Sequence, residues 1–225
     1  MTGGPTIPAG ADPDVPMSSG PSRSSADDGP PPHAQPLSSE RTARLLEGVD
    51  VLVVDLDGTI TSDDTLELLR AGAGAAPQLA GRWREAVATS KQAEKVLLHA
   101  EVGLDVTALS YRCEVLSLLA GVRGRVGKVA LVTGSSVTLA RDVAGHLGGF
   151  DEVLGTTLEV NLTGPRKAAA LVERYGSDEV WYVGDSPADV PVWRAVTGGV
   201  VVGGRRPEWM PEDLRRVVPL AVEDR

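Results

Sequence analysis

Cysteine is almost missing from this sequence, which has Cys113 alone and therefore cannot form an intrachain disulfide or a metal site of several cysteines. No apolar run approaches the roughly 20 residues that a helix needs to span a bilayer. Clustered Lys and Arg are also lacking, and the formal net charge is −9, whereas nucleic-acid binding demands a basic surface. We therefore expect a cytoplasmic protein without a membrane span or a nucleic-acid partner. The apolar neighbours of Cys113 favour a place for its thiol in the core.

Residues 1–40 differ in composition from the rest of the chain. They are rich in Pro, Gly and Ser, and their few apolar residues show no periodicity. Such a segment cannot bury enough apolar surface to offset the entropy lost on ordering, so we expect a disordered tail. It does not have the basic and then apolar segments of a secretory signal. The remainder is long enough for a domain with a sizeable core and an insertion.

Short runs of apolar, mostly β-branched residues recur along the remainder, and each is followed by a loop and by helical spacing. Runs that are apolar at every position suit strands covered on both faces, and their alternation with helices indicates a parallel sheet in an α/β fold. Helices are expected at about 136–147, 166–175 and 187–196, the first of them capped by Ser135 or Ser136. The expected strands are Val51–Val54, Val129–Val132, Val180–Val183 and Val200–Val202, with a weaker one at Glu152–Leu154.

The segment between the first two strong strands is too long for one crossover helix. It has no good strand, and its apolar residues recur at helical spacing, which predicts four helices. We expect residues 63–124 to form a small helical bundle inserted into a core made of residues 41–62 and 125–225. An insert at this point of an α/β fold lies over the carboxyl ends of the strands, where ligands bind. It is therefore placed to act as a cap.

The first strand ends in an acidic pair. The run V-L-V-V-D-L-D-G-T, residues 51–59, puts Asp55 at the end of the strand and Asp57 just beyond it. Two neighbouring carboxylates repel each other and resist burial unless a cation lies with them. Mg²⁺ suits this position because it binds one or two carboxylates together with phosphate oxygens. A polar turn explains the same residues equally well, because D-G is a frequent turn dipeptide.

Polar side chains follow two later strands as well. Thr133 and Gly134 precede a helix, where a hydroxyl and free N–H groups bind anions, although such residues more often form an ordinary N-cap. Gly184-Asp185-Ser186-Pro187-Ala188-Asp189 is a second acidic loop; its alternative is a solvated loop at the start of a helix. Lys167 opens another helix and can reach the edge of the sheet, or it is a solvated surface lysine. All of these groups fall at one edge of the expected sheet.

In this order the segments resemble the four motifs of the haloacid dehalogenase superfamily. D-L-D-G-T matches the first motif, Thr133 the second, Lys167 the third and G-D-S-P-A-D the fourth, so the resemblance spans Asp55 to Asp189. The helical insert after the first motif is similar to the cap of phosphoserine-phosphatase-like members. The resemblance implies a Rossmann-like, three-layer α/β core with a parallel sheet and an inserted helical cap.

The resemblance also implies a phosphatase mechanism. Asp55 is then the nucleophile that forms an aspartyl phosphate, and Asp57 is the acid and base that serves the leaving group and the water. A carboxyl group at residue 57 indicates phosphate ester hydrolysis or phosphomutase chemistry, not dehalogenation, and of the two we favour a phosphatase. Mg²⁺ is implied as the cofactor, held by the carboxylate of Asp55, the main-chain carbonyl of Asp57 and Asp185. Asp189 orders either the surroundings of the metal or the lysine.

Phosphate binding and substrate choice are implied at further positions. Thr133, Gly134 and Lys167 would hold the phosphoryl oxygens, and the expected substrate is a small phosphorylated metabolite. Asp64 falls where phosphoserine phosphatases carry a substrate-sensing Glu, so it is a candidate for substrate selection. That departure, and Gly58 in place of the usual Ser, count against phosphoserine itself.

A second resemblance leaves the partner open. Residues 166–176, followed by G-D-S-P-A-D-V-P-V-W-R-A, look like the soluble domain fused to some membrane prenyltransferases. The substrate would then be a prenyl- or sugar-linked phosphate, or a small phosphorylated metabolite. The competing class is a non-catalytic partner that uses a phosphate-site fold to bind or regulate another protein. The sequence does not indicate an oligomeric state.

Overall fold

The structure, a computed structural model, describes residues 35–176 and 178–222. Most of the tail that we expect to be disordered, residues 1–34, lies outside the described residues. Residues 35–40 were assigned to the same tail, but in the structure they begin the fold. Leu37 forms a parallel bridge with Leu220, and the Ser38 side chain accepts a hydrogen bond from the Arg41 N–H at the start of α1, Ser39–Leu45. The apolar side chain of Leu37 packs against the core and ties this segment down.

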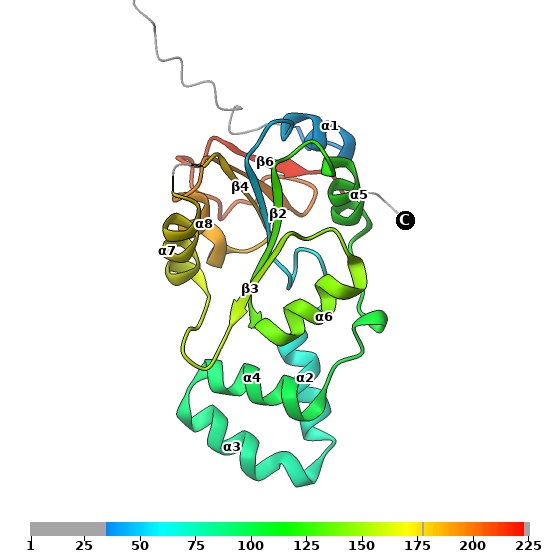
Figure 1. The fold of residues 1–225 in the computed structure, drawn as a ribbon, viewed down its shortest axis with the longest axis vertical. Coiled ribbons are helices and arrows are strands. Elements are labelled where there is room, and N and C mark those ends of the chain that lie inside the picture. The colour runs from blue at the N-terminus through cyan, green and yellow to red at the C-terminus, as the bar shows by residue number, and fades with distance from the viewer. Residues whose placement is uncertain (1–34, 177, 223–225) are drawn as a thin grey trace, which may run out of the picture.

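Within the described residues the centre of the molecule is a sheet of six parallel strands in the order β3-β2-β1-β4-β5-β6 (Figure 1). The strands are β1 Val51–Val54, β2 Lys128–Ser136, β3 Glu152–Thr156, β4 Val180–Gly184, β5 Gly198–Val202 and β6 Val217–Leu220. The predicted parallel α/β sheet is therefore confirmed. The sequence analysis missed β6, which is short and contains Pro219, a residue that argues against a strand except at a sheet edge.

Helices cover both faces of the sheet. Leu52 and Val54 of β1 pack into the apolar cluster that includes α1, α5 and α6, whereas Val51 and Val53 pack into the cluster that includes α7 and α8. These helices are α5 Cys113–Val122, α6 Val137–Leu147, α7 Gly164–Tyr175 and α8 Val190–Trp193. Ser136 is the N-cap of α6. The helix expected at 187–196 is shorter, a 3₁₀ turn at Pro187–Asp189 followed by α8.

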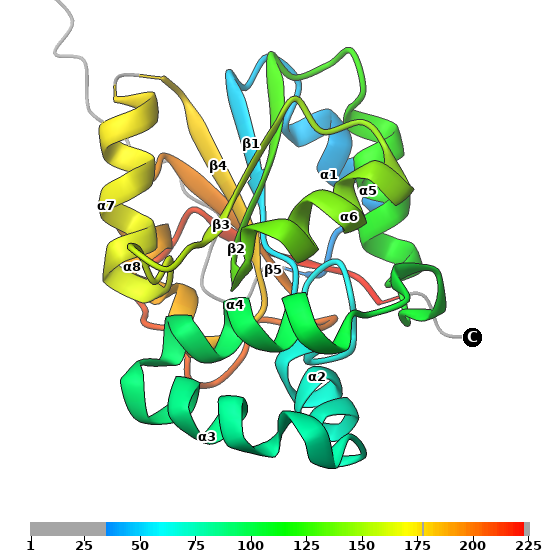
Figure 2. The same cartoon turned by 60° about the horizontal axis from the view of Figure 1, so that its bottom comes forward.

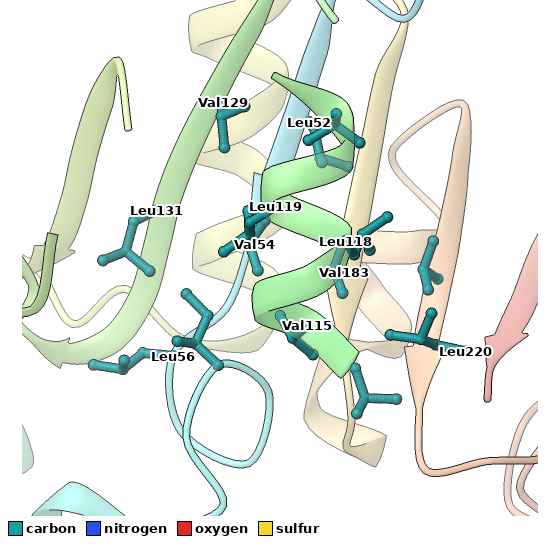
Figure 3. Close-up of a cluster of buried hydrophobic side chains, with 14 of the residues drawn as sticks. Leu52, Val54, Leu56, Val115, Leu118, Leu119, Val129, Leu131, Val183 and Leu220 are labelled. Carbon is teal, nitrogen blue, oxygen red and sulfur yellow. The ribbon is translucent and has the colours of Figure 1, made fainter. Parts of the chain in front are cut away.

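The helices of the insert separate into two groups. Three of them, α2 Thr65–Gly74, α3 Ala80–Thr89 and α4 Lys91–Val102, share a small apolar cluster around Leu69, Ala73 and Leu98. The fourth, α5, packs on the sheet instead: Figure 3 shows its buried side chains against those of β1 and β2. Residues 63–124 therefore do not form the single helical bundle that the sequence predicts. The reason is that α5 is apolar enough to be covered by both α1 and the sheet.

One exposed residue departs from expectation. Cys113 lies at the first position of α5 with its side chain exposed, although its neighbours Glu114 and Val115 are buried. Helical geometry turns residue 113 away from the face that carries Val115 and Leu118.

No helix in the described part of the chain is both long and apolar enough to cross a membrane.

The group of α2, α3 and α4 lies at the end of the molecule where β1, β2 and β4 finish (Figures 1 and 2). A partly buried ion pair holds the group together, because the Arg70 guanidinium on α2 binds both carboxylate oxygens of Glu94 on α4 at 2.8 and 2.9 Å. The Trp83 indole N–H of α3 donates to the same carboxylate at 3.3 Å. Arg70 lowers the pKa of Glu94 through these contacts. The three helices are therefore joined to one another as they face the strand ends.

Candidate active site

Asp55 directly follows β1, and its carboxylate is almost fully buried, with the residue 9% exposed. The Lys167 Nζ donates to its Oδ2 at 2.7 Å, and the Leu56 N–H donates to its Oδ1 at 2.8 Å. The Tyr182 hydroxyl lies 3.0 Å from the same Oδ2. The sheet brings these groups together because β1 pairs with β4, which carries Tyr182, and α7 carries Lys167 across the sheet edge. A buried carboxylate is thus matched by a buried ammonium.

Tyr182 lies at the centre of this cluster. Its hydroxyl group contacts several partners but has only one proton to donate. Its hydroxyl oxygen is 2.6 Å from Asp189 Oδ1 and accepts a hydrogen bond from Lys167 Nζ at 2.9 Å. Burial raises the pKa of Tyr182 well above its usual value, and the charges of Asp55 and Asp189 add to the effect. The phenol therefore stays protonated and donates to one of the two carboxylates.

Asp57 also has a buried carboxyl group, but different residues hold it. Its Oδ1 accepts from the Thr65 N–H at 2.9 Å and the Thr65 hydroxyl at 2.6 Å, and its Oδ2 accepts from the Ser135 hydroxyl at 2.6 Å. Burial raises the pKa of Asp57, and these hydrogen bonds oppose the rise without cancelling it. Ser135, one of the two expected helix caps, thus binds Asp57, while Thr65 links the first turn of α2 to the strand ends.

The second acidic loop packs against the first. Asp185 Oδ1 accepts a hydrogen bond from the Thr59 hydroxyl at 3.0 Å. Burial raises the pKa of Asp185 to about 6, and the charges of Asp189 and Asp55 add to this effect. Glycine suits residue 58, because its φ is +71° and a Cβ would overlap the Asp185 carboxylate in its present position. The two loops approach each other closely only because residue 58 has no side chain.

Asp189 holds the acidic loop in shape. It is 2% exposed, and its Oδ2 accepts from the backbone N–H groups of Asp185 and Ser186, both at 3.1 Å, and from the Ser186 hydroxyl at 3.2 Å. Its Oδ1 faces Tyr182 and lies 3.8 Å from Lys167 Nζ. Burial is the main cause that raises the pKa of Asp189, and the charge of Asp55 raises this pKa further. Both carboxylate oxygens therefore have protein partners.

A pocket of about 300 Å³ opens beside these groups. Asp55, Asp57, Lys167 and Asp189 all line it, so the structure brings together side chains that follow β1 and β4 and one from α7. Leu66 of α2 contributes from the helical group above. A volume of this size is at the small end of the range for ligand pockets.

The other predicted site residues differ in their relation to this pocket. Thr133 is fully buried, and its hydroxyl accepts from the Ser135 N–H at 3.0 Å, so it shapes the turn, while Gly134 lines the pocket. Asp64 is exposed at the rim and serves as the N-cap of α2, accepting from the N–H groups of Leu66 and Glu67 at 3.0 and 3.2 Å. Its carboxylate is therefore already engaged by the backbone.

Two residues of the site were missed in the sequence. Tyr182 was counted only as a strand residue, although it is the one side chain of V-W-Y-V with a hydroxyl. Lys95 of α4 lines the pocket, and its Nζ donates to the Gly134 carbonyl at 2.6 Å. A signal was present for Lys95, because it lies on the same helical face as Leu98 and Val102, at spacings of three and seven residues.

The oxygen donors at this edge fit a hard divalent cation. In the described ranges no three His, Cys, Asp or Glu side chains are grouped as a ready-made metal cluster. Mg²⁺ does not require such a cluster, because it keeps several waters and takes one or two carboxylates. Asp55 and Asp185 follow adjacent strands, and the charge of Asp55 helps to raise the pKa of Asp185, an effect that a nearby cation would oppose.

Comparison with known proteins assigns the family. The sequence model of the haloacid dehalogenase-like hydrolases matches residues 52–194, which include both acidic loops and Lys167. The chain belongs to this family. The resemblance inferred from the four motifs is thus confirmed for the family. A curated relative of this haloacid dehalogenase-like hydrolase is "Uncharacterized protein y4nM" of Sinorhizobium fredii, which is 35% identical over 153 residues. That match covers 68% of this chain and only 30% of the relative, so the chain spans less than a third of that protein.

Solved structures share the fold of this family member. A haloacid dehalogenase family hydrolase from Salmonella enterica serovar Typhi has a TM-score of 0.55 at 14% identity, covering 79% of this chain and 70% of that one. A phosphoserine phosphatase with a phospho-aspartyl intermediate analogue has a TM-score of 0.51 at 10% identity, covering 79% and 96%. A putative phosphoglycolate phosphatase from Lactobacillus delbrueckii has a TM-score of 0.51 at 15% identity, covering 78% and 95%. Identities this low show the common fold alone.

Proposed function

We propose that this hydrolase is a Mg²⁺-dependent phosphatase that acts on a small phosphomonoester. One observation carries the proposal: the carboxyl groups of Asp55 and Asp57 line the same pocket, and the Lys167 ammonium lies 2.7 Å from Asp55. A nucleophile, an acid and a cation for the phosphoryl charge are thus available around one small volume. The size of the pocket supports a small phosphorylated metabolite as the substrate.

The reaction proceeds in two displacements on phosphorus. In the first, an oxygen of Asp55 forms a bond to phosphorus while the ester P–O bond breaks, and Asp57 gives its proton to the leaving oxygen. The raised pKa of Asp57 supports its protonated form at that moment. In the second, water attacks phosphorus, Asp57 takes the proton of the water, and the bond from phosphorus to Asp55 breaks. Phosphate, the alcohol and the free carboxylate of Asp55 result.

The remaining residues hold charge and geometry. Lys167 and the Gly134 N–H bind the phosphoryl oxygens, and Thr133 shapes the turn that presents Gly134. The carboxylates of Asp55 and Asp185 and the main-chain carbonyl of Asp57 would hold Mg²⁺, with Asp189 fixing the loop of Asp185. When bound, this ion supplies positive charge to the phosphoryl oxygens and to the two acidic loops.

The group of α2, α3 and α4 acts as the cap in this proposal. It contributes Leu66, Lys95 and Asp64 to the pocket, which supports a role in excluding water and selecting the substrate. Asp64 lies at the rim of the pocket, and we propose that it contributes to the choice of substrate there. The acidic composition and the near absence of cysteine support a cytoplasmic location.

The test is hydrolysis of p-nitrophenyl phosphate with Mg²⁺ and with excess EDTA. We expect activity that EDTA abolishes and added Mg²⁺ restores. Asp55→Asn should lower kcat by about 10³-fold or more, because it removes the nucleophile while keeping the shape. The matched control is Asp213→Asn, which removes an exposed carboxylate that pairs with Arg194 away from the pocket. Activity that survives in Asp55→Asn contradicts the proposal.

A panel of phosphorylated compounds then addresses the substrate. It should include phosphoserine, sugar phosphates and a prenyl phosphate, which are the alternatives that the sequence raises. Silence of the folded protein across the whole panel would support the non-catalytic binding role.

A further inference from the structure

The pocket contains two ammonium groups in different electrostatic situations. Lys167 is paired with Asp55 at 2.7 Å and lies 3.8 Å from Asp189. Lys95 forms no ion pair with any residue that the structure describes, and its Nζ donates instead to the Gly134 carbonyl at 2.6 Å. A half-buried cation that has only a neutral acceptor is costly, and an arriving anion relieves that cost. Lys95 is therefore the cation of the pocket that is available to a ligand.

The surroundings of Lys95 place it on the leaving-group side. Lys95 lines the same pocket as Asp57, and its Nζ donates to the carbonyl of Gly134, next to Ser135, whose hydroxyl binds Asp57 Oδ2 at 2.6 Å. In the proposed mechanism Asp57 protonates the leaving oxygen, so a group near Asp57 faces the alcohol part of the substrate. Lys95 comes from α4, in the helical group above the pocket, which is the side where the alcohol part must lie.

The contact between Lys95 and Gly134 can be exchanged at little cost. The Gly134 carbonyl also accepts a hydrogen bond from the Thr156 hydroxyl at 2.7 Å, so the carbonyl keeps a partner when Lys95 turns away. The helix itself is held in place one turn further on, where His99 Nε2 lies 3.1 Å from Asp142 Oδ2 of α6. This contact joins α4 to α6 one turn from Lys95, so the ammonium can change partner without a shift of the helix.

We propose that Lys95 determines specificity by binding a second anionic group on the alcohol part of the substrate, such as a carboxylate or another phosphate. This inference rests on the proposed function. It names the substrate class as small phosphomonoesters that carry a further negative charge. Lys167 and the bound cation serve the transferred phosphoryl group, and Lys95 serves the second charge.

The experiment compares three substrates of nearly the same shape: ethyl phosphate, phosphoglycolate and phosphoethanolamine. The carboxylate oxygens of phosphoglycolate and the ammonium nitrogen of phosphoethanolamine lie the same number of bonds from phosphorus, whereas ethyl phosphate ends in an uncharged methyl group one atom earlier. For the wild type we expect kcat/KM to be highest for phosphoglycolate and lowest for phosphoethanolamine. In Lys95→Met the ratio of phosphoglycolate to ethyl phosphate should fall by about 10- to 100-fold, as for the loss of one charged hydrogen bond. Lys95→Arg should keep much of the preference.

The control is Lys91→Met, one helical turn earlier on α4 and exposed, which should leave the ratios unchanged. Thermal unfolding of all variants checks that they fold. An equal loss for all three substrates in Lys95→Met would mean that Lys95 binds the phosphoryl group, and it would overturn the inference. Unchanged ratios would overturn it as well. If the wild type hydrolyses neither these esters nor p-nitrophenyl phosphate, the proposed function itself fails, which is a distinguishable result.

Discussion

At the scale of single residues, the most constrained feature is the buried cluster of Asp55, Lys167, Tyr182 and Asp189. The carboxylates of Asp55 and Asp189 share one ammonium and one phenol proton. The hydrogen-bonded atoms are 3.0 Å or less apart, whereas Lys167 Nζ and Asp189 Oδ1 are 3.8 Å apart. Buried charges are tolerated when each has a partner. Removing one partner leaves a buried charge without compensation for its lost hydration. The hydroxyl of Tyr182 is therefore important although it is not a reacting group.

Tyr182→Phe tests this arrangement. The substitution leaves Asp189 Oδ1 without its closest donor, so we expect the free energy of unfolding to fall by about 1–3 kcal/mol. Because Asp55 and Lys167 lose a shared partner, kcat should fall by about tenfold, the equivalent of ~1.4 kcal/mol. Denaturant unfolding and steady-state kinetics with p-nitrophenyl phosphate measure the two effects.

Tyr175→Phe is the matched control for that variant. The Tyr175 hydroxyl is also in a mostly buried place and donates to Glu152 Oε2 at 3.0 Å, but it does not line the pocket. We expect a loss of stability with kcat unchanged. If both tyrosine variants lose kcat equally, Tyr182 has no special part in positioning Asp55.

The candidate site could be predicted where its residues follow strands. Asp55 and Asp185 lie after buried apolar runs, and parallel strands place such residues at one edge. Tyr182 and Lys95 could not be placed in the same way. Whether Tyr182 faces Asp55 or the opposite face depends on the pairing of β1 with β4, and the reach of Lys95 depends on how α4 docks. Helical spacing puts Lys95 on the apolar face of α4, but the contacts of both residues are tertiary and cannot be read from local sequence.

At the scale of elements, the difference between α5 and the other inserted helices is the main correction to the sequence analysis. Helical periodicity predicts each helix but does not say which partner its apolar face meets. Leu118 of α5 packs with the sheet, whereas Leu98 of α4 packs in the small cluster of α2–α4 (Figure 3 for Leu118). The two leucines are both 1% exposed, so they allow a direct comparison.

Leu118→Ala and Leu98→Ala should therefore destabilise different parts of the protein. Leu118→Ala removes core contacts and should lower the free energy of global unfolding by about 2–5 kcal/mol. Leu98→Ala should mainly speed hydrogen exchange within residues 65–102, because a small cluster can open without the core. Hydrogen exchange with mass spectrometry distinguishes the two, and identical exchange patterns would show that α2–α4 and the core unfold as one unit.

At the scale of the whole molecule, the strand order decides how the site is assembled. In the order β3-β2-β1-β4-β5-β6 the chain passes from β1 to β2 and β3 on one side of β1. It then returns to β4, which lies on the other side of β1. The strand order therefore brings the loops after β1 and β4 together, although they are more than 120 residues apart in sequence. Periodicity predicted parallel strands but not their order, which depends on tertiary pairing and is found only in the structure.

The central claim is that Asp55 accepts the phosphoryl group, and the most direct measurement is to trap it there. The enzyme is mixed with p-nitrophenyl phosphate and Mg²⁺, quenched with acid during turnover and reduced with borohydride, which converts an aspartyl phosphate to homoserine. Peptide mass spectrometry then locates the modified residue. The account predicts homoserine at position 55. In the control, Asp57→Asn protein that has not been mixed with substrate, it predicts no homoserine. Homoserine at another aspartate, or none at any aspartate while the enzyme turns over, would contradict it.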